Sequence, residues 1–151
     1  MTWIELLCFT ANCAALAYGG YTDWKRREIP NAVPLTLLLT GLLHWRRIPL
    51  RLVCMAVMML ILWFSSKLTK SPLPGGDFKL LCALTFSAGP AVTLASVLLT
   101  GLAASAAGLA VKKPLRRHIP LCTYMAPAYF TAELIFLSIS FLILSGFAIF
   151  Q

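Results

Sequence analysis

The sequence predicts an all-α polytopic membrane protein with about six transmembrane helices, and three observations predict it. Hydrophobic residues make up 60% of the 151 residues and charged residues only 12%, a composition far outside that of soluble globular domains. The apolar residues fall in runs separated by short segments that hold most of the charges. Such runs fill nearly the whole length, so we expect a single membrane-embedded domain over residues 1–151.

The first half of the chain contains three of these runs. The first covers Trp3 to Thr22, and we expect it to remain a helix because no basic residue precedes it as in a signal peptide. The charged segment Asp23 to Asn31 follows and holds the helix-stopping Pro30. A shorter second run covers Ala32 to Trp45, and arginines separate it from the third, Leu52 to Ser66. Each run is expected to be one helix.

The second half begins with a segment, Lys67 to Asp77, whose two prolines and two glycines stop the preceding helix. The 32 residues from Leu80 to Val111 carry no charge. As one helix they measure roughly 48 Å, against a hydrocarbon core of about 30 Å. The run is therefore expected to turn back at Ser87-Ala88-Gly89-Pro90. The last span is expected from Pro127 to Phe150. Small residues spaced for close helix packing mark the return helix: Gly101, Ala104, Ser105 and Gly108.

The basic residues test the count of six spans, because cytoplasmic loops are enriched in Lys and Arg. With both termini outside the cytoplasm, ten basic residues lie inside and three outside. A single span over Leu80 to Val111 moves four of the ten outside and removes the asymmetry. The inside set is Lys25, Arg26, Arg27, Lys67, Lys70, Lys79, Lys112, Lys113, Arg116 and Arg117, and the outside set is Arg46, Arg47 and Arg51. We therefore expect a multi-pass protein of the inner (cytoplasmic) membrane.

The composition also indicates which binding partners to expect. The net charge of +8 sits in short clusters between apolar runs, where it sets membrane orientation, so lipid is expected as a partner and nucleic acid is not. The two histidines, His44 and His118, fall on opposite membrane sides, so we expect no metal, and no cofactor is predicted. The cysteines lie mostly in apolar runs without a CxxC pair and are expected to pack as small apolar side chains: Cys8, Cys13, Cys54, Cys82 and Cys122.

Asp23 and Asp77 are the only aspartates among five acidic residues, and both fall at the cytoplasmic ends of predicted helices. Two carboxylates that share a proton can hydrolyse a peptide bond, one activating water as general base and the other donating a proton as general acid. The sequence does not assign the two roles. In the alternative interpretation each aspartate is an interfacial residue paired with nearby Lys or Arg.

The residues around both aspartates resemble motifs of the type IV prepilin peptidases. The stretch Tyr21 to Asn31 resembles the family's D-x-x-x-R-x-I-P-N signature, and Gly75 to Leu80 resembles the G-D-x-K-L part of its G-x-G-D motif. A third stretch, Arg117 to Pro120 followed by Ala126-Pro127, is similar to the I-P region before the family's last helix.

The resemblance implies a membrane aspartyl protease with Asp23 and Asp77 as its catalytic pair. It would remove the short basic leader from prepilins or pseudopilins, whose hydrophobic amino-terminal helix follows the leader, at the cytoplasmic membrane face. Gly75 and Gly76 would shape the backbone beside Asp77. Arg27, Pro30 and Asn31 would shape the first loop, although Arg27 equally fits a topology role. Lys79 would either neutralise a carboxylate or serve as an inside-positive residue.

The chain departs from the family pattern in three places. Pro74 stands where the motif has its first glycine, which keeps open the alternative of a degenerate homologue that acts as a scaffold in a pilus or secretion assembly. The I-P region is stretched by Leu121 to Met125. Larger members carry a CxxC-containing domain that methylates the new amino terminus of the pilin. This sequence shows no such domain, so we expect it to cleave without methylating.

Glu133 is an acidic residue inside the last apolar run. If that helix begins near Pro127, Glu133 lies about 9 Å along it and near the site. The alternative is a hydrogen-bonded packing residue. A small transporter that uses the acidic pair for ion coupling is the third function class, and the absence of an internal repeat disfavours it.

Overall fold

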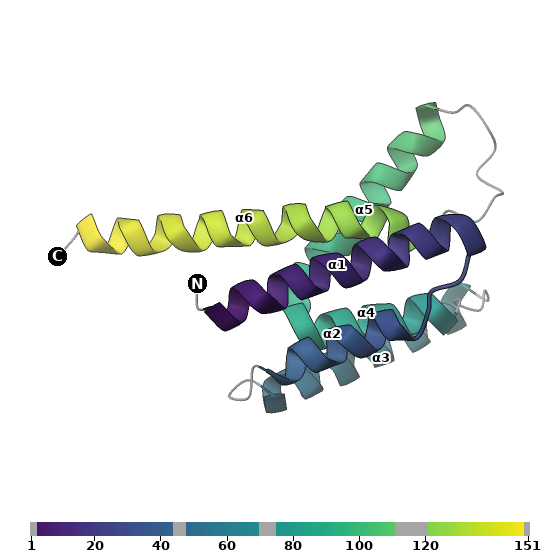
Figure 1. The fold of residues 1–151 in the computed structure, drawn as a ribbon, viewed down its shortest axis with the longest axis horizontal. Helices are drawn as coiled ribbons and strands as arrows, with labels where there is room; N and C mark the ends of the chain where they lie inside the picture. The colour runs from purple at the N-terminus through teal and green to yellow at the C-terminus, as the bar shows by residue number, and fades with distance from the viewer. Residues whose placement is uncertain (1–2, 44–47, 70–74, 111–120, 150–151) are drawn as a thin grey trace.

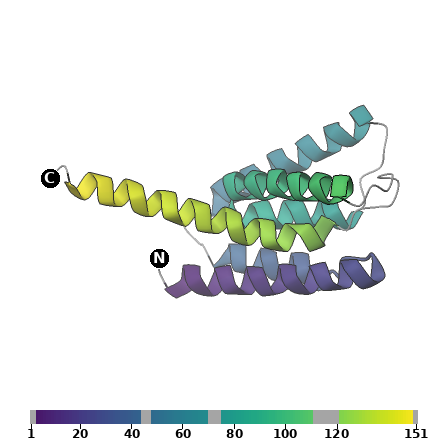
Figure 2. The same ribbon diagram turned by 90° about the horizontal axis from the view of Figure 1, so that it is seen from above.

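The computed structural model describes residues 3–43, 48–69, 75–110 and 121–149, and every regular element in these ranges is an α-helix. Successive helices alternate in direction, and the two termini lie at the same end of the bundle (Figures 1 and 2). Which end faces the cytoplasm stays a prediction from the charge distribution. The six helices are α1 (Trp3–Arg26), α2 (Ala32–Leu42), α3 (Ile48–Thr69), α4 (Gly75–Ala88), α5 (Pro90–Ala110) and α6 (Leu121–Ile149).

Three of the described helices are long and apolar enough to cross a membrane: α3 over Ile48–Leu68, α5 over Pro90–Ala107 and α6 over Leu121–Ser140. The helix α2 is apolar but shorter. Large apolar side chains on the outside of the bundle are widely exposed, such as Val53, Leu60 and Leu98. Such an exterior fits a protein solvated by lipid, in line with the predicted membrane protein.

The predicted turn within Leu80 to Val111 is confirmed. Gly89 separates α4 from α5 and has a positive φ of 92°, which glycine adopts without steric cost. Its backbone N–H donates to the Thr85 carbonyl at 3.0 Å. The next residue, Pro90, begins α5, a helix position that needs no N–H donor.

Several predicted helix boundaries are wrong: α1, α3, α4 and α6 are longer than predicted, whereas α2 ends at Leu42 rather than at Trp45. The helix α1 continues through Asp23 to Arg26, α3 begins at Ile48 rather than Leu52, and α4 already includes Gly75 and Gly76. The helix α6 begins at Leu121, with Pro127 inside it, because transmembrane helices tolerate proline where neighbouring groups satisfy the freed carbonyl. Both aspartates therefore lie on helices.

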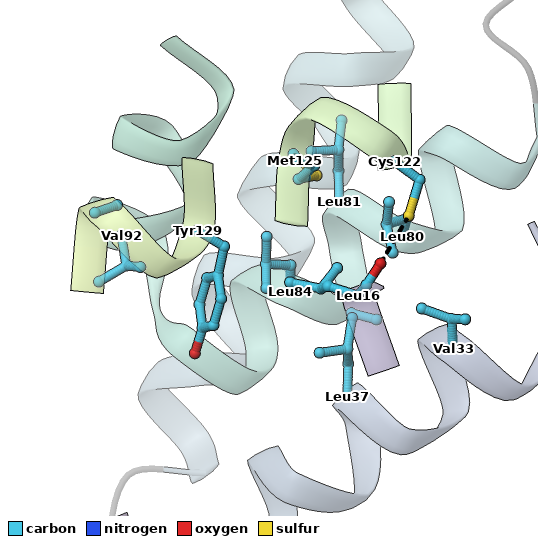
Figure 3. Packing of buried hydrophobic residues seen from close by; sticks show 12 residues of the cluster. Leu16, Val33, Leu37, Leu80, Leu81, Leu84, Val92, Cys122, Met125 and Tyr129 are labelled. Carbon is cyan, nitrogen blue, oxygen red and sulfur yellow. Dashed lines mark hydrogen bonds between the residues drawn. The ribbon is translucent and has the colours of Figure 1, made fainter. Parts of the chain in front are cut away.

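The core is formed mainly by α1, α2, α4 and α6, and α4 lies among α2, α3 and α5. Leu80 and Leu84 of α4 meet Leu16 of α1 and Leu37 of α2 (Figure 3). Cys122 of α6 completes this contact, and its thiol faces the Leu16 carbonyl at 3.8 Å. The helix α3 packs on the far side of α4. A helix surrounded in this way is buried on most of its faces, which explains why α4 shows little amphipathic pattern.

A buried polar cluster joins α1, α2, α4 and α6 within this core. The Asn12 amide donates to Ser87 Oγ at 2.8 Å and to Tyr129 Oη at 3.2 Å. Thr40 Oγ1 donates to Asn12 Oδ1 at 2.6 Å, and Tyr129 Oη donates to Glu133 Oε1 at 3.1 Å. Since an unsatisfied polar group costs several kcal/mol in an apolar medium, this cluster fixes how the four helices are placed along one another.

Glycines permit the closest helix contacts, but not where the sequence predicts them. A Cβ at Gly20 would lie 3.1 Å from Thr123 Cα, and one at Gly19 would lie 2.9 Å from Cys122 Sγ. Both contacts bring α1 against the start of α6. At Gly101 no described atom lies within 4 Å of such a Cβ, so the predicted close approach there is wrong. Gly101 instead lies on an exposed part of α5.

We predict that Gly20→Leu destabilises the protein by about 1–3 kcal/mol because the new side chain meets α6 backbone that cannot move aside locally. The measurement is the free energy of unfolding in detergent. Gly101→Leu is the matched control and is expected to change stability by less than about 0.5 kcal/mol. Equal losses in both variants would contradict the close contact between α1 and α6.

Candidate active site

Asp23 lies in the last turn of α1 and is buried, with 8% of its surface exposed. The backbone N–H of Cys122 donates to its Oδ2 at 3.0 Å. Cys122 is the second residue of α6, so the carboxylate sits at a helix amino terminus, where free N–H groups and the helix dipole stabilise negative charge. One carboxylate of the predicted pair is thus fixed in position.

The contact that delivers this N–H depends on residues one turn before Asp23. Gly19 and Gly20 let α6 approach, and Thr123 Oγ1 donates to the Gly20 carbonyl at 2.9 Å. The sequence predicts no role for Leu121–Met125 and does not indicate this contact, because any residue except proline can supply a backbone N–H. The adjacent glycines just before the aspartate were the one available signal.

Asp77 lies in the first turn of α4 and is half-buried. Burial raises the pKa of its carboxyl group, and the nearby Asp23 carboxylate raises it further. The Cys122 thiol lies within electrostatic reach of both aspartates. Asp23 and Asp77, on separate helices, thus lie within electrostatic reach of each other, and their role as a catalytic pair stays a prediction.

The segment between α1 and α2 holds three of the predicted site-shaping residues. Arg27 is exposed and ends α1 with a positive φ of 55°, while its N–H donates to the Asp23 carbonyl at 2.9 Å. The Pro30 carbonyl accepts from Val33 N–H at 3.0 Å. Asn31 occupies the N-cap position of α2 without a side-chain capping bond. These residues act on the helix ends through their backbones.

The two glycines before Asp77 make no close contact with the described residues. A Cβ at Gly76 would lie 3.5 Å from Ile29 Cβ, an ordinary contact, and none of the described atoms lies within 4 Å at Gly75. Gly76 nevertheless places the start of α4 against Ile29, so the two motif segments touch. Lys79 is exposed, and no described ion pair joins it to either aspartate. Pro74 lies outside the described residues.

Glu133 does not belong to this site. Because α6 begins at Leu121, Glu133 lies about 18 Å along it, and its carboxylate accepts the hydrogen bond from Tyr129 in the buried polar cluster. The prediction that placed it about 9 Å from the helix start is wrong. Its hydrogen-bonded packing role is the one that the structure supports.

Within the described ranges, no group of three or more His, Cys, Asp or Glu side chains is arranged to hold a metal ion. The two histidines, His44 and His118, and the I-P region at residues 117–120 lie outside those ranges. The chemistry that the described site offers is that of two neighbouring carboxyl groups, one hydrogen-bonded and buried, the other half-buried.

Comparison with known proteins gives a family match. The model of the type IV leader peptidase family matches residues 10–110, two thirds of the chain. The match includes both aspartates and the segment between α1 and α2, and it ends before the described start of α6. Neither curated proteins nor solved structures gave a match.

We predict that Arg27→Gly leaves stability unchanged or raises it by up to about 1 kcal/mol, because glycine adopts the positive φ without strain. Arg26→Gly is the matched control, and it is expected to cost about 0.5–1 kcal/mol because Arg26 is helical. Both values come from unfolding in detergent. A loss at Arg27 as large as that at Arg26 would show that the arginine side chain matters.

A second prediction concerns the coupling of the two carboxyl groups. Asp23→Asn removes a negative charge beside Asp77, so the Asp77 pKa is expected to fall while burial still keeps it above its ordinary value. Since the chain has two aspartates, ¹³C-labelled aspartate marks Asp77 alone in this variant, and infrared spectroscopy follows its protonation with pH. Its titration midpoint is compared with the higher midpoint of the wild type. Glu28→Gln is the control, and an unchanged midpoint in Asp23→Asn would contradict the coupling.

Proposed function

Because the chain belongs to the type IV leader peptidase family, we propose that it is an aspartyl endopeptidase that removes the short basic leader from prepilins or pseudopilins. The observation that carries the proposal is the pairing of Asp23 and Asp77 at the ends of two helices, with Asp23 held by the Cys122 N–H. The cut occurs at the cytoplasmic face of the inner membrane. In this proposal the cleavage proceeds without methylation of the new amino terminus.

The different surroundings of the two carboxyl groups supply the acid and base roles. Asp23, held in place by the Cys122 N–H, acts as general base on the attacking water. Asp77, whose pKa is raised by burial and by Asp23, holds the shared proton and acts as general acid. Water attacks the peptide carbonyl carbon, Asp23 takes its proton, and Asp77 protonates the carbonyl oxygen. Collapse of the tetrahedral intermediate then expels the amine, which receives a proton from Asp23, while one hydroxyl group of the intermediate returns a proton to Asp77.

The direction of the pH dependence follows from these roles. Activity requires a protonated Asp77, so cleavage falls as the pH rises through the raised pKa of that residue. It also falls at acidic pH, because a general base has to be ionised to accept a proton. The profile is bell-shaped, and its two limbs report apparent pKa values of the pair.

We predict that Asp23→Asn and Asp77→Asn each reduce leader removal by about 10²–10⁴-fold, because each replaces a proton-transfer group by a nearly isosteric amide. The measurement is the mobility shift of a co-expressed prepilin, with membrane levels of each variant checked in parallel. Glu28→Gln, an exposed acidic residue between α1 and α2, is the control.

Unchanged processing in both aspartate variants would reject the aspartyl mechanism. If the wild-type protein itself leaves the leader intact, the scaffold alternative that Pro74 keeps open is favoured instead. The two outcomes differ because only the first retains cleavage.

A further inference from the structure

An open groove of about 340 Å³ lies between α2 and α3, with α4 as its floor. Both helices pack against α4 but hardly touch each other. Leu35 and Leu38 form one wall, Met55 and Met59 form the other, and Phe78 lies on the floor. The lining is almost entirely apolar. Leu35 and Met59 are 58% and 52% exposed, so the described chain leaves both walls open.

The groove begins at the candidate catalytic pair. Phe78, on its floor, directly follows Asp77, and Lys79 and Asn31 are the polar side chains in its lining. From Asn31 to Leu38 the groove follows α2 for seven residues, or about 10 Å. This length corresponds to two helical turns, which present three or four anchor side chains of a docked helix.

The opposite side of the pair is closed. Asp23 is buried, and the start of α6 covers it through Cys122 and Thr123, which pack against Gly19 and Gly20. Asp77 is only half-buried. A peptide bound at the two carboxyl groups therefore continues along the Asp77 side, where the groove provides an apolar route along α4.

We propose that this groove binds the apolar helical segment that follows the cleaved bond of the substrate. The inference rests on the proposed leader-peptidase function and names the surface that holds its substrate. The basic leader does not fit the groove, because the lining offers no negative charge and includes the basic residue Lys79. The apolar side of the cut fits the lining.

The groove contributes orientation rather than hydrophobic attraction. In lipid an apolar segment gains little from leaving the acyl chains, so helix contacts depend on shape and close packing. Holding the segment beside Asp77 fixes the position of the peptide bond before attack. Met55 and Met59 are flexible side chains that adapt to irregular surfaces, so the groove tolerates apolar segments of different sequence.

The test uses substitutions on each wall that fill part of the groove. Leu35→Trp and Met59→Trp each place a larger side chain in the groove without altering a buried residue. Leu98→Trp is the control, because Leu98 is 69% exposed on α5, away from the groove. Two polypeptide probes are cleaved in lipid vesicles. Both contain a basic leader and a glycine, followed in one by an apolar helix of about 20 residues and in the other by a polar tail.

The expected result is a selective loss. In both wall variants the kcat/KM of the helical probe, relative to that of the polar-tail probe, falls about tenfold, mainly through KM, which corresponds to a steric clash of about 1.4 kcal/mol. Leu98→Trp keeps the wild-type ratio. Wild-type ratios in both wall variants would overturn the groove assignment and leave the leader-peptidase function standing.

A binding measurement separates the two proposals. A photo-crosslinking amino acid replaces Met59 in an Asp77→Asn background and is expected to capture the helical probe, whereas the same group at Leu98 captures only lipid. Capture of lipid alone at both positions overturns the groove assignment. If wild-type protein cleaves neither probe, the proposed function fails, and the crosslink still decides whether the groove binds the helix.

Discussion

The arrangement of the site depends on how closely α1 and α6 approach each other. Gly19 and Gly20 leave no side chain between the helices, so the first turn of α6 reaches the last turn of α1. That contact gives Asp23 the Cys122 N–H and removes it from solvent. The different surroundings of Asp23 and Asp77 follow from it, because α6 covers one carboxylate and leaves the other half-exposed.

Much of the fold follows from the sequence because lipid imposes strong rules on composition and helix length. Those rules place the helices in order and locate the turn at Gly89. They do not fix the helix ends, because proline and glycine stop helices in water more reliably than in a packed bundle. Pro127 lies inside α6, and Gly75 and Gly76 belong to α4.

The candidate site, like the fold, could be predicted from the sequence only in part. Asp23 and Asp77 are identifiable because aspartate is rare in this chain and both lie within recognisable motifs. The hydrogen-bond donor to Asp23 is a backbone N–H, which cannot be recognised in a sequence because nearly every residue type has one. Arg27 is a candidate site residue because of its charge. In the structure its contribution is a left-handed backbone conformation that ends α1. Glu133 is also conspicuous, as an acidic residue in an apolar run, but it belongs to the buried polar cluster. Asn12 of that cluster lies about 16 Å from Asp23 along α1.

The short helix α4 has a consequence for the water that the proposed hydrolysis needs. Its 14 residues measure about 21 Å, less than a hydrocarbon core of about 30 Å. Because α2, α3 and α5 pack against α4, protein rather than lipid surrounds most of it, which is where polar backbone groups and water are tolerated at membrane depth. On the proposed function, the shortness of α4 thus leaves space among the helices for water and a substrate backbone beside Asp77.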